Sequence, residues 1–188
     1  GVESLPAADH RRGAVGEGGV FTHEFGHAIN LAHAKVNGDV LFFGNNAAPT
    51  GCTGLGTPTF QQIETMYPLL CPSPGCTGRW QATPDRDDIV SLSNLYPSAT
   101  WLTAHGTIAG AVRTIAGTTE ISGVNVIARN VADPFGDAVS FISGDFTSPR
   151  PAGGSAVGDY FLRGLTPGAS YRLQVDELPA PGDDQGAF

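Results

Sequence analysis

Lysine is almost absent from this chain, because Lys35 is the single lysine among 188 residues and the net charge is −8. Proteins that bind nucleic acid or an anionic membrane surface concentrate Lys and Arg on one face. Long apolar runs are missing as well, whereas a membrane-spanning helix needs about twenty apolar residues in a row. We therefore expect no nucleic-acid partner and no membrane span.

Cysteine is also scarce, with three residues that allow three alternative single bridges and leave one thiol over. They are Cys52, Cys71 and Cys76. A disulfide between the 44–58 loop and the 71–76 loop would suit a secreted protein. Zinc binding by these cysteines is the less favoured interpretation, because one C-x4-C pair is a weak signature. We expect a secreted or extracellular protein, a bacterial-type cell surface included, although no signal peptide is visible.

Histidine, by contrast, is clustered: three of the five lie in "VFTHEFGHAINLAH", residues 20–33. His23 and His27 are four residues apart and would share one face of a helix. Two imidazoles on one face can bind one metal ion, which is usually zinc. Glu24 lies next to that face, where it can reach a metal-bound water. A solvated or core histidine face is the alternative, but an accidental H-E-x-x-H match is on the order of one in a few hundred.

His33 can reach the same metal only if the helix ends near residue 30 and the chain turns back. Asn30 stands at that point, and Asn tolerates a left-handed backbone best after Gly. Apolar residues at helical spacing predict a separate face that packs on a core. These residues are Phe21, Phe25, Ile29 and Ala32. The segment is therefore predicted to be a helix, a stop and a returning third ligand.

The motif resembles the signature of the metzincin metalloproteases, H-E-x-x-H-x-x-G-x-x-H followed by a Met-turn. The chemically active positions all match: His23, Glu24, His27 and His33. The departure is Asn30, where most members have Gly. The single methionine, Met66 in "IETMYPLL", resembles the Met-turn of the matrixin branch, where Met-Tyr-Pro is common. Residues 85–97, "DRDDIVSLSNLYP", resemble the last helix of a matrixin catalytic domain, so the resemblance covers about residues 18–97.

This resemblance implies a zinc endopeptidase that acts on a protein or peptide substrate. One catalytic Zn²⁺ would be held by three neutral imidazoles, with water at the fourth position and the pKa of that water lowered to near 7. Glu24 would accept the proton of the water and pass it to the leaving amine. Met66 would form an apolar floor under the metal. Tyr67 and Pro68 would line the pocket for the side chain that follows the scissile bond.

The second half of the chain is predicted to form short antiparallel strands between Gly and Pro turns. The predicted strands are 106–113, 122–130, 138–143, 158–165 and 170–177. "GDYFLRGLTPGASYRLQV" resembles the closing strands of carboxypeptidase-regulatory-like domains, which share a transthyretin-like sandwich. A Ca²⁺ loop at Asp133, Asp137 and Asp145 is less favoured than solvated turns, because no EF-hand spacing is present.

We therefore expect an α+β protein of two parts: the mainly helical C-terminal part of a metzincin catalytic domain, and an all-β sandwich. The expected divisions are a partial catalytic domain at 1–97, a linker at 98–105, the sandwich at 106–178 and a tail at 179–188. In the family that this chain resembles, a twisted sheet and a further helix precede the zinc helix. Only 22 residues precede His23 here, which is too few for a five-stranded sheet. We accordingly expect a fragment in which the apolar face of Phe21, Phe25 and Ile29 lacks most of its cover and residues 106–178 fold independently.

A second functional hypothesis is a noncatalytic secreted adhesion or binding protein that retains the zinc-site helix only as structure. Glu24 separates the two hypotheses. A structural zinc site normally closes with a fourth protein ligand and gains nothing from an acid beside an open position. No fourth ligand is evident in the sequence, so we favour the enzyme. His10 and His105 are assigned no role.

Overall fold

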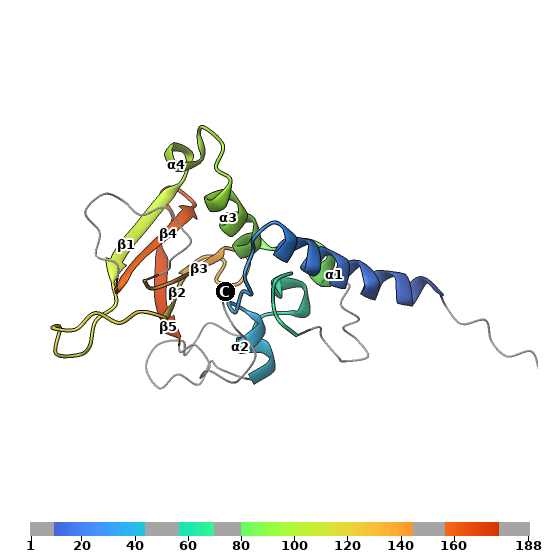
Figure 1. Cartoon of the computed structure of the whole chain (residues 1–188), viewed down its shortest axis with the longest axis horizontal. Coiled ribbons are helices and arrows are strands. Elements are labelled where there is room, and N and C mark those ends of the chain that lie inside the picture. The colour runs from blue at the N-terminus through green and yellow to red at the C-terminus, as the bar shows by residue number, and fades with distance from the viewer. Residues whose placement is uncertain (1–9, 44–56, 70–79, 145–156, 177–188) are drawn as a thin grey trace, which may run out of the picture.

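The computed structural model describes residues 10–43, 57–69, 80–144 and 157–176 (Figure 1). The helices are α1 (His10–Ala28), α2 (Gly38–Phe43), α3 (Arg86–Leu95) and α4 (Trp101–Ala104), with 3₁₀ turns η2 (Phe60–Gln62) and η3 (Trp80–Ala82). The strands are β1 (Gly106–Ala111), β2 (Asn125–Asn130), β3 (Ala138–Ile142), β4 (Asp159–Leu165) and β5 (Tyr171–Asp176). The three cysteines, Asp145 and the expected tail at 179–188 lie outside these residues. No described helix has the length and apolar character needed to cross a bilayer.

Each of the five predicted strand segments contains one strand. β1 pairs with β4, and β3, β2 and β5 form a second sheet in that order, with every pairing antiparallel. The described chain is thus a mixed α and β fold with two small antiparallel sheets, which lie beside α3 in Figure 1.

β2 is covered on both faces, which explains its unbroken run of buried residues. Val126 and Ala128 point into a core shared with α3 and β4. On the opposite face, Ile127 packs against Val36 in the segment that follows the histidine motif. In β5, Leu173 and Val175 are exposed, and the polar Gln174 between them is buried. The buried face of β5 is therefore opposite to the one that hydrophobicity favours.

Residues 98–105 hold the short helix α4, and they join the two halves closely. Trp101 of α4 is buried in the core of Val90 and the strands, and its indole N–H donates to Asn94 at 3.0 Å. Gly164 on β4 has φ +75° and allows the close approach, since a Cβ there would lie 2.9 Å from both Trp101 and Val90. Residues 106–178 thus share buried surface with α3 and α4, and their independent folding remains a prediction.

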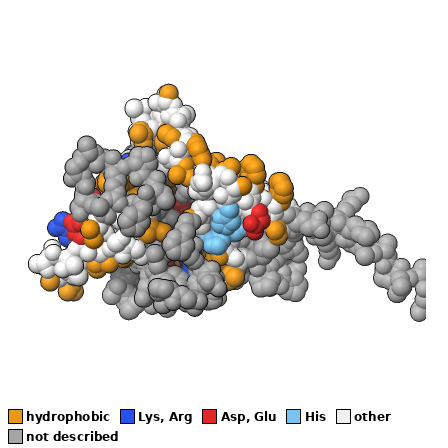
Figure 2. All heavy atoms as spheres, viewed as in Figure 1, with side chains coloured by type: hydrophobic (Ala, Val, Ile, Leu, Met, Phe, Trp, Pro, Cys, Tyr) orange, Lys and Arg blue, Asp and Glu red, His pale blue; other side chains and the backbone are white. Residues whose placement is uncertain are grey.

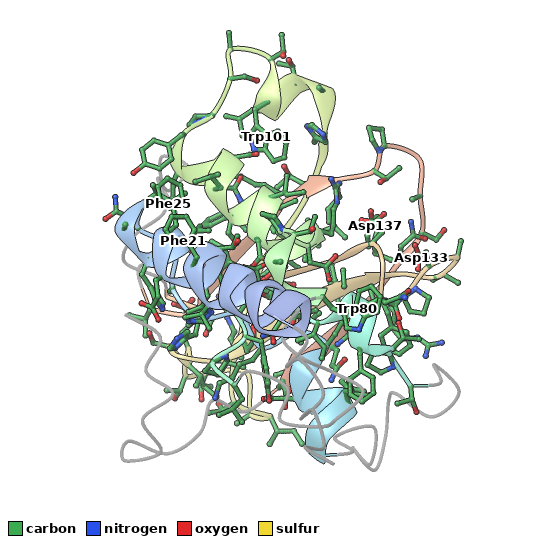
Figure 3. The ribbon with its side chains drawn as sticks, turned by 90° about the vertical axis from the view of Figure 1, so that its right-hand side faces the viewer. Phe21, Phe25, Trp80, Trp101, Asp133 and Asp137 are labelled. Carbon is green, nitrogen blue, oxygen red and sulfur yellow. The ribbon has the colours of Figure 1, made fainter. Side chains whose placement is uncertain are left out.

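α1 contacts the rest of the chain through small residues. Gly18 faces Ala82, and the Thr22 hydroxyl donates to the Ala82 carbonyl at 3.2 Å. Phe21 and Phe25 stack on each other with ring centroids 6.4 Å apart, but they are 73% and 55% exposed and project from α1 in Figure 3. Their exposure agrees with the expectation that they lack cover, whereas Ile29 of the same predicted face packs against the cluster of Leu31, Ala34 and Met66.

α3 begins with acidic residues that are buried rather than solvated. Asp85 caps the helix by accepting from the backbone N–H of Arg86 at 2.8 Å. The Asp87 carboxylate accepts from the Ser140 N–H at 2.6 Å and from the Ser140 hydroxyl at 3.0 Å, so it ties α3 to β3. Burial raises the pKa of Asp87 to about 7 and that of Asp85 to about 6.

Asp87→Asn is expected to change how stability depends on pH. Between the ordinary pKa of 3.8 and the folded value of about 7, folded Asp87 holds a proton that the unfolded chain has lost. Wild-type stability should therefore fall relative to Asp87→Asn as the pH rises from 4 to 8, by on the order of a few kcal/mol. Urea unfolding of both proteins at pH 5 and pH 8 measures this difference, and parallel profiles would contradict it.

Candidate metal centre

The predicted helix stop is confirmed by the geometry of Asn30. Its φ is 68°, the one positive φ of a non-glycine residue in the described part of the chain. The Asn30 N–H donates to the His27 carbonyl at 3.0 Å, and the Leu31 N–H donates to the Gly26 carbonyl at 2.9 Å. These two bonds form a Schellman motif, in which a left-handed residue ends the helix and reverses the chain. The reversal returns His33 to the helix face that carries the other two histidines.

The three histidines of the motif converge as the sequence predicted. The Nε2 atom of His27 lies 3.1 Å from Nε2 of His23 and 3.2 Å from Nε2 of His33. Ligand nitrogens of the three rings all lie within 4.8 Å of one another. Zn–N bonds are about 2.0–2.1 Å, so tetrahedral nitrogens around zinc stand about 3.3 Å apart. The separations therefore fit a single small metal ion.

Backbone carbonyls fix the orientation of two of these rings. His23 Nδ1 lies 2.8 Å from the Thr65 carbonyl oxygen, and His27 Nδ1 lies 2.9 Å from the Leu31 carbonyl oxygen. A carbonyl only accepts, so each Nδ1 carries the proton and each Nε2 presents a lone pair. Two lone pairs that face each other at 3.1 Å repel, and a cation between them relieves the repulsion. The donor set is thus arranged for a metal.

His33 is the third candidate ligand and the one with the fewest hydrogen bonds to its ring among the described residues. Its Nδ1 is buried and has no hydrogen-bond partner among the described residues. Burial, followed by electrostatic interaction with His27, His23 and Lys35, lowers the pKa of His33 to about 4. The ring is therefore neutral at pH 7, which is the state that binds metal.

Glu24 stands beside the three rings at the surface. Its side chain is exposed on α1, next to His23 in the sequence, and its charge opposes the lowering of the His33 pKa. Figure 2 shows the histidine side chains as a patch open to solvent with acidic atoms beside it. An acid in this position can exchange protons with a water or substrate at the open side of the centre.

Met66 lies directly under the histidine helix. It is 1% exposed, and Gly26 faces it so closely that a Cβ at position 26 would overlap the Met66 sulfur. The Ala34 N–H donates to the Met66 carbonyl at 3.0 Å, while the Asp88 carboxylate accepts from the N–H groups of Thr65 at 2.8 Å and Met66 at 3.2 Å. The turn is thus fixed between the returning segment and α3, in a position suited to an apolar floor.

Tyr67 and Pro68 continue this turn, but they face different surroundings. Tyr67 is 1% exposed and its hydroxyl donates to Asp39 at 2.8 Å, while burial raises its pKa. Pro68 is partly exposed. A cavity of about 140 Å³ beside His33 is lined by residues 30–34, Met66, α3 and β3, and neither Tyr67 nor Pro68 lines it. Their role in a substrate pocket remains a prediction.

Sequence reasoning missed the residues that support the centre from a distance. Glu64 is completely buried and accepts from the backbone N–H groups of Asn37 and Gly38, and its burial raises its pKa well above the ordinary value. Arg129 of β2 is buried against the same segment. An acid among apolar residues, in "IETM", was the one local signal of such a role.

The acidic loop between β2 and β3 forms turns in this structure. Asp133 accepts from the Gly136 N–H at 3.0 Å, and Asp137 accepts from the Tyr171 hydroxyl at 2.7 Å and from the Thr166 hydroxyl at 3.0 Å. Figure 3 labels both carboxylates. Within the described residues, a grouping of His, Cys, Asp or Glu fit to hold a metal occurs only at the three histidines.

No protein-family model, no curated protein and no solved structure matches this chain. The interpretation of the centre therefore depends on its own geometry and on the resemblance of its motif.

Purified protein is expected to contain one zinc ion per chain, and His27→Ala is expected to lose it. His27 supplies the nitrogen that lies between the other two, so two ligands alone would bind far more weakly. Elemental analysis after dialysis measures the difference. Equal metal content in the two proteins would refute the site.

Gly26→Ala and Gly18→Ala make a matched pair of substitutions on α1. An added methyl group at position 26 must displace Met66, whereas at position 18 it meets Ala82 at an ordinary 3.8 Å. Alanine gains about 1 kcal/mol over glycine within a helix, and overpacking costs about 1–3 kcal/mol. Gly18→Ala should raise the melting temperature, and Gly26→Ala should lower it and weaken zinc binding. Equal shifts would show that the contact with Met66 is not tight.

Proposed function

We propose that this chain is a zinc-dependent endopeptidase of the metzincin type, similar to the matrixins. The observation that carries the proposal is that three imidazole nitrogens converge, with two of their rings fixed by backbone carbonyls. Glu24, next to His23 in the sequence, is exposed on α1. The motif and the helix stop supply the family resemblance, and the buried Met66 supports it. The substrate would be a protein or peptide.

His23, His27 and His33 would hold the metal through Nε2. Zinc bound there would supply a Lewis acid that polarises the scissile carbonyl and lowers the pKa of water to near 7. Glu24 would accept a proton from the attacking water at its carboxylate and deliver it to the amine that leaves. The carbonyls of Thr65 and Leu31 would keep the rings in the ligating tautomer throughout.

The finer fold assignment belongs to the same proposal. Residues up to about 97 would correspond to the C-terminal part of a matrixin-like catalytic domain, and residues 106–178 to a carboxypeptidase-regulatory-like sandwich formed by the two small sheets. Tyr67 and Pro68 would border the pocket for the side chain after the scissile bond. The protein would act in a secreted or extracellular setting.

The alternative is a noncatalytic binding protein with a structural zinc site. Such a site closes its coordination with a fourth protein ligand. Within the described residues the metal-ligating group consists of three histidines, and Glu24 remains exposed beside them. These two observations favour the enzyme.

Glu24→Gln is expected to separate metal binding from chemistry. Zinc content should stay at the wild-type level, because Glu24 does not belong to the ligand group. Turnover of a fluorogenic peptide library should fall by roughly 10² or more, since the amide cannot accept the proton. His27→Ala serves as the metal-free reference.

Two outcomes would count against the proposal. Unchanged turnover in Glu24→Gln would show that Glu24 is not the base. Zinc-loaded wild-type protein that cleaves no peptide in the library would favour the binding protein instead.

A further inference from the structure

The backbone that follows His33 crosses from the metal centre to the sheet. The Ala34 N–H donates a hydrogen bond to the Met66 carbonyl. The carbonyls of Lys35 and Val36 accept from side chains of β2, and Asn37 precedes the first residue of α2. The Asn125 side chain of β2 donates to the Lys35 carbonyl at 3.5 Å. Residues 34–37 therefore connect His33, the third candidate ligand, to strand β2.

Arg129 of β2 holds the end of that segment. Its side chain is 1% exposed. One terminal nitrogen donates to the Val36 carbonyl, and the other donates to the Asn37 side-chain oxygen at 2.7 Å and to the Pro134 carbonyl at 3.1 Å. Its Nε donates to Gln174 at 2.9 Å, which locks the guanidinium from the β5 side.

The opposite side of the segment is held by Glu64. Its carboxylate accepts from the backbone N–H groups of Asn37 and Gly38. The Asn37 side chain also donates to the carbonyls of Gln62 at 2.8 Å and Phe135 at 2.9 Å. Asn37 is thus fixed in both directions, by the turn region that carries Met66 and by the sheet.

His33 depends on this support more than the other ligands do. His23 and His27 lie on a helix and donate to carbonyls, whereas the buried Nδ1 of His33 has no partner among the described residues. Its ring can be placed only through its backbone and packing. This inference rests on the proposed metal centre: we propose that Arg129 is a positioning residue for His33. The sheet that contains β2 would then help to hold the third ligand in place.

Arginine suits this task for a physical reason. The planar guanidinium offers five donors in a fixed fork, so it donates to the Val36 carbonyl and to the side-chain oxygen of Asn37 at the same time. A lysine keeps the positive charge but carries one mobile ammonium group, which cannot reproduce the fork. Arg129→Lys therefore tests geometry, whereas Arg129→Gln tests geometry and charge together.

The experiment uses the full chain loaded with Co²⁺, whose visible absorption reports the geometry of the ligands. Arg129→Gln should lower Co²⁺ and Zn²⁺ affinity by about tenfold, the lower end for loss of a supporting residue, and should change the visible bands. The metal affinity of Arg129→Lys should lie between those of Arg129→Gln and the wild-type protein. Arg113→Gln is the control, because Arg113 is 53% exposed on the same β half and pairs with Glu120 at 3.0 Å.

Circular dichroism of each protein separates misfolding from misplacement. Folded Arg129→Lys or Arg129→Gln with wild-type affinity and bands would overturn the inference, and so would an equal loss in Arg113→Gln. If Arg129→Gln does not fold, Arg129→Lys alone decides in the same way. Wild-type protein that binds no Co²⁺ would refute the metal centre and with it the proposed function, which is a separate result.

Discussion

The candidate metal centre depends on the buried carboxylate of Asp88, which holds the turn at Thr65 and Met66 in place. It accepts from the N–H groups of Thr65 and Met66, and so it sets the direction of the carbonyls in that turn. The Thr65 carbonyl fixes the tautomer of His23, and the Met66 carbonyl accepts from the N–H of Ala34 in the segment that returns His33. A single acid of α3 thus determines how the turn meets both the helix and the returning chain.

The parts of the centre that the sequence predicts are those whose partners are close in the chain. The spacing of His23 and His27 on a helix, and the left-handed Asn30, depend on local geometry alone, and both predictions agree with the structure. The five predicted strand segments each contain a strand as well, because the Gly and Pro turns that bound them are local signals. Zinc and peptidase activity remain proposals, since no relative tests them.

The remaining features depend on contacts between distant residues. In the sequence, Arg129 is an ordinary arginine of a predicted strand. Its partners Val36 and Asn37 lie 93 and 92 residues away in the chain, so only the folded structure identifies them. The acids at the start of α3 suit a helix dipole in the sequence, yet the structure buries Asp87 against β3. Periodicity placed Phe21, Phe25 and Ile29 on one apolar face, but it could not show that Ile29 alone of the three meets a core, because periodicity does not identify the neighbour that covers a face.

The covering of β2 on both faces has a consequence for the order of assembly. The histidines span a loop of 10 residues, from His23 to His33, whereas the bond from Arg129 to Val36 closes a loop of 93. Closing the longer loop costs about 2 kcal/mol more in chain entropy. We therefore expect the three histidines to gather early in folding and the sheet to dock late. Maturation of the centre would then be limited by long-range docking, which is slow in proteins with distant contacts.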